Sequence, residues 1–218
     1  MTEQIKMGVK MLRYGHNIGL NMGMAGFFFL FGVVIECLPI FQLRIWGDYM
    51  IIVNGMWMVQ ILYSVNVAGL VQTSPWKKRL QTSVPVFIGY LGYALCYLVI
   101  VLLKILEFVR ADAGQLATVP TMLIIDAVIG AWMLVYCGTV FKYYIPSTII
   151  FIGVFYGWFF GSDILQGLPQ TALPIWAAVV IGYVILLAGA ALQYGLARLV
   201  YRKALDKRGQ LRGLQKYM

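Results

Sequence analysis

Long apolar runs separated by short polar segments dominate the chain from residue 20 to residue 200. Most are close to the roughly 20 residues that a helix needs to cross a bilayer, where the backbone has no hydrogen-bond partners except its own. Runs of this length favour helices over a β-barrel. They predict an all-α, polytopic integral membrane protein, with a single transmembrane domain over residues 1–218 and six transmembrane helices: Leu20–Ile40, Tyr49–Val71, Val84–Leu106, Val119–Phe141, Ile145–Gly161 and Leu173–Val200.

The segment before the first run predicts an amphipathic helix within residues 1–17. In residues 3–13, apolar side chains recur at i, i+4 and i+7, and three cations recur on an adjacent face. Such a helix lies in the cytoplasmic interface with its cations toward the headgroups. The alternative is a charged start that only fixes orientation. The tail over residues 201–218 is basic and predicts a short cytoplasmic extension.

The polar segment over residues 72–83 has its own helix-start signal. Ser74 suits an N-cap and Pro75 suits the first helical position. Trp76 and Leu80 are i, i+4 neighbours that would face the membrane body or a partner's groove. The pattern predicts a short helix lying across the cytoplasmic end of the second and third spans; a loop decorated with orientation charges is the alternative. Its residues are Ser74, Pro75, Trp76, Lys77, Lys78, Arg79 and Leu80.

Charge agrees with this topology. Only 11% of the residues are charged and 61% are hydrophobic, whereas soluble domains are about 25% charged and about 45–50% apolar. Of the 17 basic residues, 14 fall on one side of the predicted spans. By the positive-inside rule, we expect both termini to be cytoplasmic. We expect the chain to lie in the cytoplasmic (inner) membrane. The net charge of +9 therefore reflects topology and attraction to anionic headgroups rather than nucleic-acid binding.

A few polar residues fall inside the predicted spans. Glu36 lies near the outer end of the first span and Asp126 about two turns inside the fourth. Ionisable groups at such depth face the bundle interior or a cavity and have partners. Arg44 is the candidate partner of Glu36, and Lys104 that of Asp126. Both acids are substrate-pathway candidates, as are two side chains of the second span, Asn54 and Asn66; the alternative is structural contact between helices.

Glycines spaced by four residues mark where helices can approach closely. Gly153, Gly157 and Gly161 form such a row on the fifth predicted span, and Gly19 and Gly23 belong to a second row at the first. These five positions are candidates for the interface of a homodimer. Packing within one chain is the alternative.

Several kinds of chemistry are not encoded. A phosphate-binding P-loop needs a Gly-Lys step, and the chain has none, so it carries no ATPase motif of its own. His16 is the sole histidine, and the three cysteines lie in apolar runs where we expect burial as small apolar residues. We therefore expect no catalytic residue, no metal site and no cofactor bound by this chain.

The layout of six spans, an N-terminal interfacial helix and the segment "LVQTSPWKKRLQTSVP" resembles the exporter-class (type-2) membrane subunits of ABC transporters. In that family the short helix docks on the ATPase subunit and transmits its closure. The resemblance covers nearly the whole chain in layout and about fifteen residues in motif. It implies that ATP and Mg are bound by a separate ATPase subunit, and that two copies of this chain work together.

The chain departs from the larger members of that family. Many of them carry a pair of short outer half-helices between the fifth and sixth spans, where this chain has only "GSDILQGLPQTALP". The resemblance is thus nearer to compact exporters of amphipathic peptides, such as phenol-soluble modulins or antimicrobial peptides. It implies outward movement of amphipathic peptide or other hydrophobic cargo. A passive solute-binding or channel-like membrane protein, or the substrate-capture subunit of an importer, is the alternative function.

Overall fold

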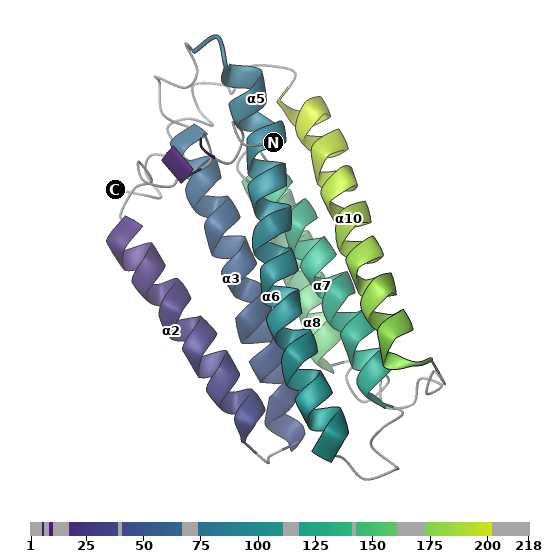
Figure 1. The fold of residues 1–218 in the computed structure, drawn as a ribbon. Helices are drawn as coiled ribbons and strands as arrows, with labels where there is room; N and C mark the ends of the chain where they lie inside the picture. Colours follow the sequence, from purple (N-terminus) through teal and green to yellow (C-terminus); the bar gives the residue numbers. More distant parts are fainter. Residues whose placement is uncertain are drawn as a thin grey trace.

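A computed structural model describes residues 6, 9–10, 18–38, 41–66, 74–110, 118–140, 143–160 and 173–201. Within these ranges all regular elements are helices and none is a strand, and the long helices run side by side in a bundle (Figure 1). They are α2 (Ile18–Cys37), α3 (Phe41–Asn66), α5 (Lys77–Gln81), α6 (Ser83–Arg110), α7 (Thr118–Val140), α8 (Tyr144–Phe160) and α10 (Ile175–Val200).

Five of the long helices match predicted runs to within four residues at each end. The start of α3 is the exception, because the helix begins at Phe41 and the prediction began at Tyr49. Of the predicted interfacial helix, only Lys6, Val9 and Lys10 are described; each is helical and exposed. The rest of that helix, the segment at 161–172 and the tail after Tyr201 lie outside the described residues.

Four stretches of the described chain are long and apolar enough to cross a membrane: α2, Lys77–Val109, α7 and α10. They carry large apolar side chains on their outer faces, including Leu20 at 68%, Val109 at 78% and Trp176 at 72% exposure. Such surface is suited to lipid and not to water. The chain is therefore a membrane protein. The predictions for α3 and α8 are confirmed as helices but not as spans, since α3 is less apolar and α8 has 17 residues.

The core lies between α3, α6, α7 and α10. Its largest fully buried side chains include Tyr63, Tyr93 and Tyr97. The most extensive packing is α7 against α10, followed by α2 against α3 and α3 against α6, while α8 packs chiefly on α7. Cys96 and Cys137 are buried in this core as predicted, but Cys37 is exposed at the end of α2, contrary to the prediction.

Helix α2 approaches α3 closely at a pair of glycines. A Cβ placed on Gly32 would lie 2.9 Å from the carbonyl oxygen of Gly47 and equally close to Ile51 Cγ1. A Cβ placed on Gly47 would lie 2.6 Å from Glu36 Oε1. Real Cβ atoms do not approach other atoms so closely, so only glycine lets the two backbones meet and the Glu36 carboxylate rest against α3.

The glycines singled out from the sequence behave differently. Among the described residues, a Cβ on Gly19, Gly23 or Gly153 would meet nothing within 4 Å, so these positions make no close helix contact there. The homodimer prediction is untested. Gly161 lies outside the described residues. Gly157 belongs to α8, and its surroundings lie outside the described part of the chain.

Candidate functional site

A cluster of charged side chains is buried where α2, α3 and α6 meet. Lys104 of α6 is its hub: Nζ lies 2.8 Å from Asp48 Oδ2, 3.0 Å from Glu36 Oε2 and 3.6 Å from Glu107 Oε2. The side chains of Lys104, Glu36 and Asp48 are each at most 5% exposed, and that of Glu107 is 14% exposed. We call these four residues the charge cluster. One ammonium thus ties together carboxylates from three helices.

Asp126 lies beside the charge cluster without joining its ion pairs. It is eight residues after the first residue of α7, about 12 Å along the helix. It is only 6% exposed and interacts electrostatically with Lys104, Asp48 and Glu36. Its Oδ2 atom is buried and accepts no hydrogen bond from the described residues. Asp126 is thus a buried carboxyl group in the field of the cluster.

Burial gives these contacts their significance. Charged groups inside a membrane protein are costly unless they are paired, and such residues mark pathways, relays or binding sites more often than those of the surface do. Since four ionisable groups gather around one point and a fifth lies beside it, this is the strongest candidate site in the described residues.

Glu36 pairs with Lys104, the residue that the sequence assigned to Asp126. The predicted pairing of Glu36 with Arg44 stays a prediction, because the side chain of Arg44 lies outside the described part of the chain. Lys104 interacts electrostatically with Asp126 but forms its short contacts elsewhere. The reason is geometric: α2 packs on α3 and α3 packs on α6, which brings Glu36 and Asp48 to the Lys104 ammonium.

Sequence reasoning missed two members of the charge cluster. Asp48 was placed in a loop, because the second span was predicted to begin at Tyr49, one residue later. Glu107 fell one residue after the predicted end of the third span at Leu106, although it is one turn from Lys104 on the same helix. The spacing of Lys104 and Glu107 at i, i+3 was the available signal.

Asn54 is not a member of the charge cluster. It is buried, and its Nδ2 donates a hydrogen bond to the carbonyl oxygen of Met50 at 2.9 Å, one turn back on α3. Its amide nitrogen is therefore engaged by its own helix, and its role in a substrate pathway stays a prediction. The side chain of Asn66, the last residue of α3, lies outside the described part.

A basic surface occupies the other end of α6. Leu80 and Gln81 of α5 are buried, and Leu80 packs with Leu62, Val84 and Ile88. Trp76 is 48% exposed, with the Arg79 guanidinium 5.4 Å from its ring centre. We call the segment Trp76, Lys77, Lys78 and Arg79 the basic cap. Trp76 and Leu80, which were predicted to face one surface together, therefore face different surroundings: Leu80 packs in the bundle and Trp76 does not.

The local geometry of the basic cap also differs from the prediction. Helix α5 begins at Lys77 with Trp76 as its N-cap. Ser74 Oγ instead accepts a hydrogen bond from the Trp76 N–H at 3.2 Å, within a turn that contains Pro75. Thr82 N–H donates to the Lys78 carbonyl and Val86 N–H to that of Thr82. Because these bonds bridge the two helices, α5 extends α6 instead of lying across the bundle (Figure 1).

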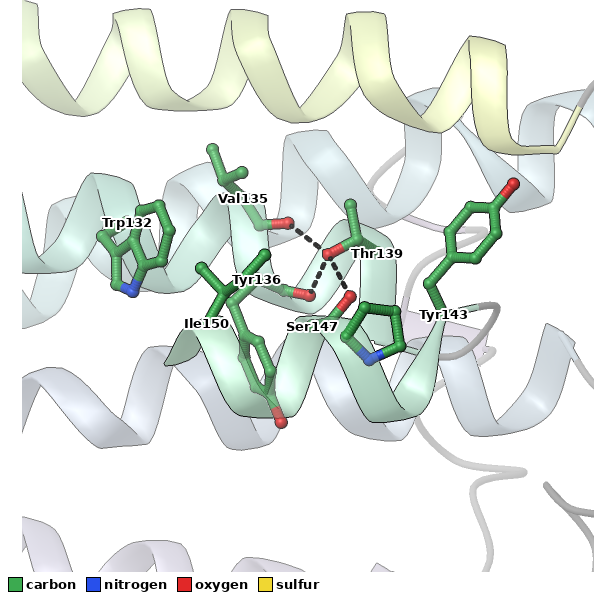
Figure 2. A pocket seen from close by; sticks show the side chains of 8 residues that line it. Trp132, Val135, Tyr136, Thr139, Tyr143, Ser147 and Ile150 are labelled. Atoms are coloured by element: carbon green, nitrogen blue, oxygen red, sulfur yellow. Dashed lines mark hydrogen bonds between the residues drawn. The ribbon is translucent and has the colours of Figure 1, made fainter. Parts of the chain in front are cut away.

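A groove of about 320 Å³ lies between α7 and α8. Figure 2 shows a side-chain hydrogen bond between the two helices, donated by Ser147 Oγ to Thr139 Oγ1 at 3.1 Å. Thr139 Oγ1 in turn lies 3.1 Å from the Tyr136 carbonyl. The remaining lining is apolar or aromatic and carries no charge. The groove therefore offers apolar surface and no chemistry comparable to that of the charge cluster.

No protein-family model, curated protein or solved structure matches the chain. Function must accordingly be argued from its two polar features. These are the charge cluster around Lys104 and the basic cap at Trp76–Arg79, which lie on opposite ends of one long helix.

Proposed function

We propose that the chain is the membrane-spanning permease subunit of an ATP-driven exporter, with a separate ATPase subunit bound at the basic cap. In this proposal α2, α3, α6, α7, α8 and α10 are the six spans, and both termini are cytoplasmic. The distribution of basic residues and the length of the apolar helices support it.

The observation that carries the proposal is the construction of the basic cap. Leu80 is held in an apolar cluster while Trp76 and the cations next to it project from the end of α6. Exposed Trp and Arg side chains are common among the residues that dominate protein–protein binding. A basic, anchored helix end of this kind suits an acidic groove on a soluble partner.

The cap is also well placed to transmit movement. Helix α6 runs from Ser83 to Arg110 and carries Lys104 near its far end. From Lys77 to Lys104 the chain is helical apart from the junction at Thr82. A displacement of the cap by a partner would thus act on the helix that holds the charge cluster together.

The cargo and the assembly follow from the same proposal. Outward movement of amphipathic peptide or other hydrophobic cargo rests on the sequence resemblance. A homodimer is supported by the outward-facing glycines Gly19, Gly23 and Gly153, which leave room for a neighbouring helix. ATP and Mg would be bound by the partner ATPase.

The charge cluster favours a second candidate, a carrier or channel-like protein that works without an ATPase. Buried ionisable groups of this kind occur in ion and proton pathways. In that case the basic cap would be only an orientation signal, and no stoichiometric partner would bind to it.

The test is gentle detergent extraction from native membranes, followed by mass spectrometry of the proteins that copurify. Wild type is compared with a variant carrying Trp76→Ala, Lys77→Glu and Lys78→Glu. Arg198→Glu is the matched control: Arg198 is an exposed cation at the same end of the bundle, but on α10 (Figure 1). We expect an ATPase with wild type and with the control, and its loss from the triple variant.

Other outcomes are equally informative. An ATPase that stays bound to the triple variant removes the basic cap from the docking site. Absence of an ATPase from wild type, under conditions that preserve known complexes, contradicts the proposal and favours the carrier. Folding is checked by melting temperature: Trp76→Ala leaves it unchanged, whereas Leu80→Ala destabilises the bundle by about 2–5 kcal/mol because it empties a buried site.

A further inference from the structure

The short contacts of the Lys104 ammonium, at 2.8 and 3.0 Å, are made with Asp48 and Glu36 and not with Asp126. A lysine ammonium carries three N–H donors, and three carboxylate oxygens surround it, from Asp48, Glu36 and Glu107. Asp126 forms no hydrogen bond with any described residue through its buried Oδ2 atom. The aspartate therefore sits in the bundle without the partner that a carboxylate needs there.

The surroundings of Asp126 oppose a negative charge on it. It interacts electrostatically with Glu36 of α2, with Asp48 of α3, and with Lys104 and the Tyr97 phenol of α6. Burial of the carboxyl group is the main obstacle to a negative charge, and two acids against one cation among its neighbours add to it. On the side of α10, the ring of Tyr183 lies edge-on against Tyr97 with ring centres 5.2 Å apart.

A metal ion is not the natural counter-charge. In the described part of the chain, no three His, Cys, Asp or Glu side chains are arranged to hold one. The position that three carboxylates share is already filled by the Lys104 ammonium. A proton needs only one oxygen, and Oδ2 of Asp126 has no other partner among the described residues.

We propose that Asp126 is an exchangeable proton-binding site within the membrane bundle, with the charge cluster as its control element. The carboxyl group holds a proton while Lys104 is engaged by Glu36 and Asp48. When Lys104 leaves those partners and turns to Asp126, the O–H bond breaks, the proton passes to water and the resulting carboxylate pairs with the ammonium. The proposal does not depend on an ATPase partner.

Infrared spectroscopy of the purified full-length chain in lipid tests this proposal directly. A protonated carboxyl group gives a C=O band distinct from those of a carboxylate. We expect that band in wild type at neutral pH, a shift of the band in D₂O, and its loss in Asp126→Asn. Glu107→Gln is the matched control, and we expect it to keep the band.

Three results would overturn the proposal. One is a wild-type spectrum with no protonated carboxyl band from acidic to neutral pH. Another is a band that disappears in Glu36→Gln or Glu107→Gln but persists in Asp126→Asn. The third is a band that does not shift after long incubation in D₂O, since the proton would then not exchange.

Stability measurements provide a second readout. A proton held by the folded chain and released on unfolding makes stability fall as pH rises through neutrality, by about tenfold in the unfolding equilibrium constant per pH unit. Asp126→Asn should therefore flatten the dependence of melting temperature on pH. An unchanged slope in a folded Asp126→Asn variant contradicts the proposal. If that variant does not fold, the wild-type spectra in water and D₂O still decide.

Discussion

Replacing Lys104 with methionine removes the single cation of the charge cluster and keeps the volume of its side chain. Nζ lies 2.8 Å from Asp48 Oδ2 and 3.0 Å from Glu36 Oε2. At an effective dielectric constant of about 20, each pair is worth about 5–6 kcal/mol of gross attraction. Desolvation of the ammonium cancels several kcal/mol of that sum, so breaking a buried ion pair costs about 3–5 kcal/mol net.

The loss of folding stability in Lys104→Met has an upper limit that depends on pH. An orphaned carboxylate can take up a proton, which costs about 4 kcal/mol at neutral pH for a group with an ordinary pKa near 4. In Lys104→Met the folded chain then binds protons that the unfolded chain releases, so its stability falls as pH rises. We therefore expect Lys104→Met to be most defective at neutral and alkaline pH and to approach wild type as the solution is acidified.

The assay is reversible unfolding in mixed micelles. Wild type is compared with Lys104→Met, with Glu36→Gln plus Asp48→Asn, and with the combined triple variant. We expect the triple variant to be more stable than Lys104→Met alone, because replacing all members of a buried ion network is better tolerated than removing one. Additive losses in the triple variant, or a Lys104→Met defect that does not diminish in acid, would refute the assigned contacts.

Two further predictions concern helix packing. Gly32→Ala should destabilise the fold by about 1–3 kcal/mol, because its Cβ would lie 2.9 Å from the Gly47 carbonyl oxygen; Gly23→Ala, with nothing within 4 Å, is the neutral control, and equal melting temperatures would contradict the α2–α3 contact. Thr139→Val and Ser147→Ala should each cost about 0.6 kcal/mol, the average for a hydrogen bond between membrane helices. The double variant should lose no more than either single variant if the 3.1 Å bond between them is real.

The positions of the long helices could be predicted from the sequence because apolar length alone decides them. The start of α3 could not. Asp48 is as polar in sequence as any loop residue, and nothing local indicates that an ammonium more than fifty positions away will neutralise it. Once Lys104 pairs with it, the helix continues through Asp48 back to Phe41. A tertiary contact thus determined an element boundary that the local pattern placed eight residues later.

The direction of the basic cap is a second feature that the local sequence could not predict. Local signals at Ser74 and Pro75 predicted a helix that begins at Pro75, whereas the structure has a turn there and the helix begins at Lys77. They did not indicate its direction, which depends on whether backbone hydrogen bonds continue past Thr82. Thr82 itself helps them continue, since its Oγ1 donates to the Lys78 carbonyl at 2.6 Å. Thr82 therefore joins the short helix α5 to α6.

The charge cluster and the packing of α2 on α3 depend on each other. Glu36 reaches Lys104 only because Gly47 has no side chain where Oε1 lies, and Gly32 brings α2 close enough for that approach. Conversely, the ion pairs of Lys104 with Glu36 and Asp48 hold both helices against α6. A charged side chain of the bundle interior and two glycines of its helix interface, which look unrelated in the sequence, are therefore parts of a single contact. A change that separates α2 from α3 must also change the electrostatic surroundings of Asp126.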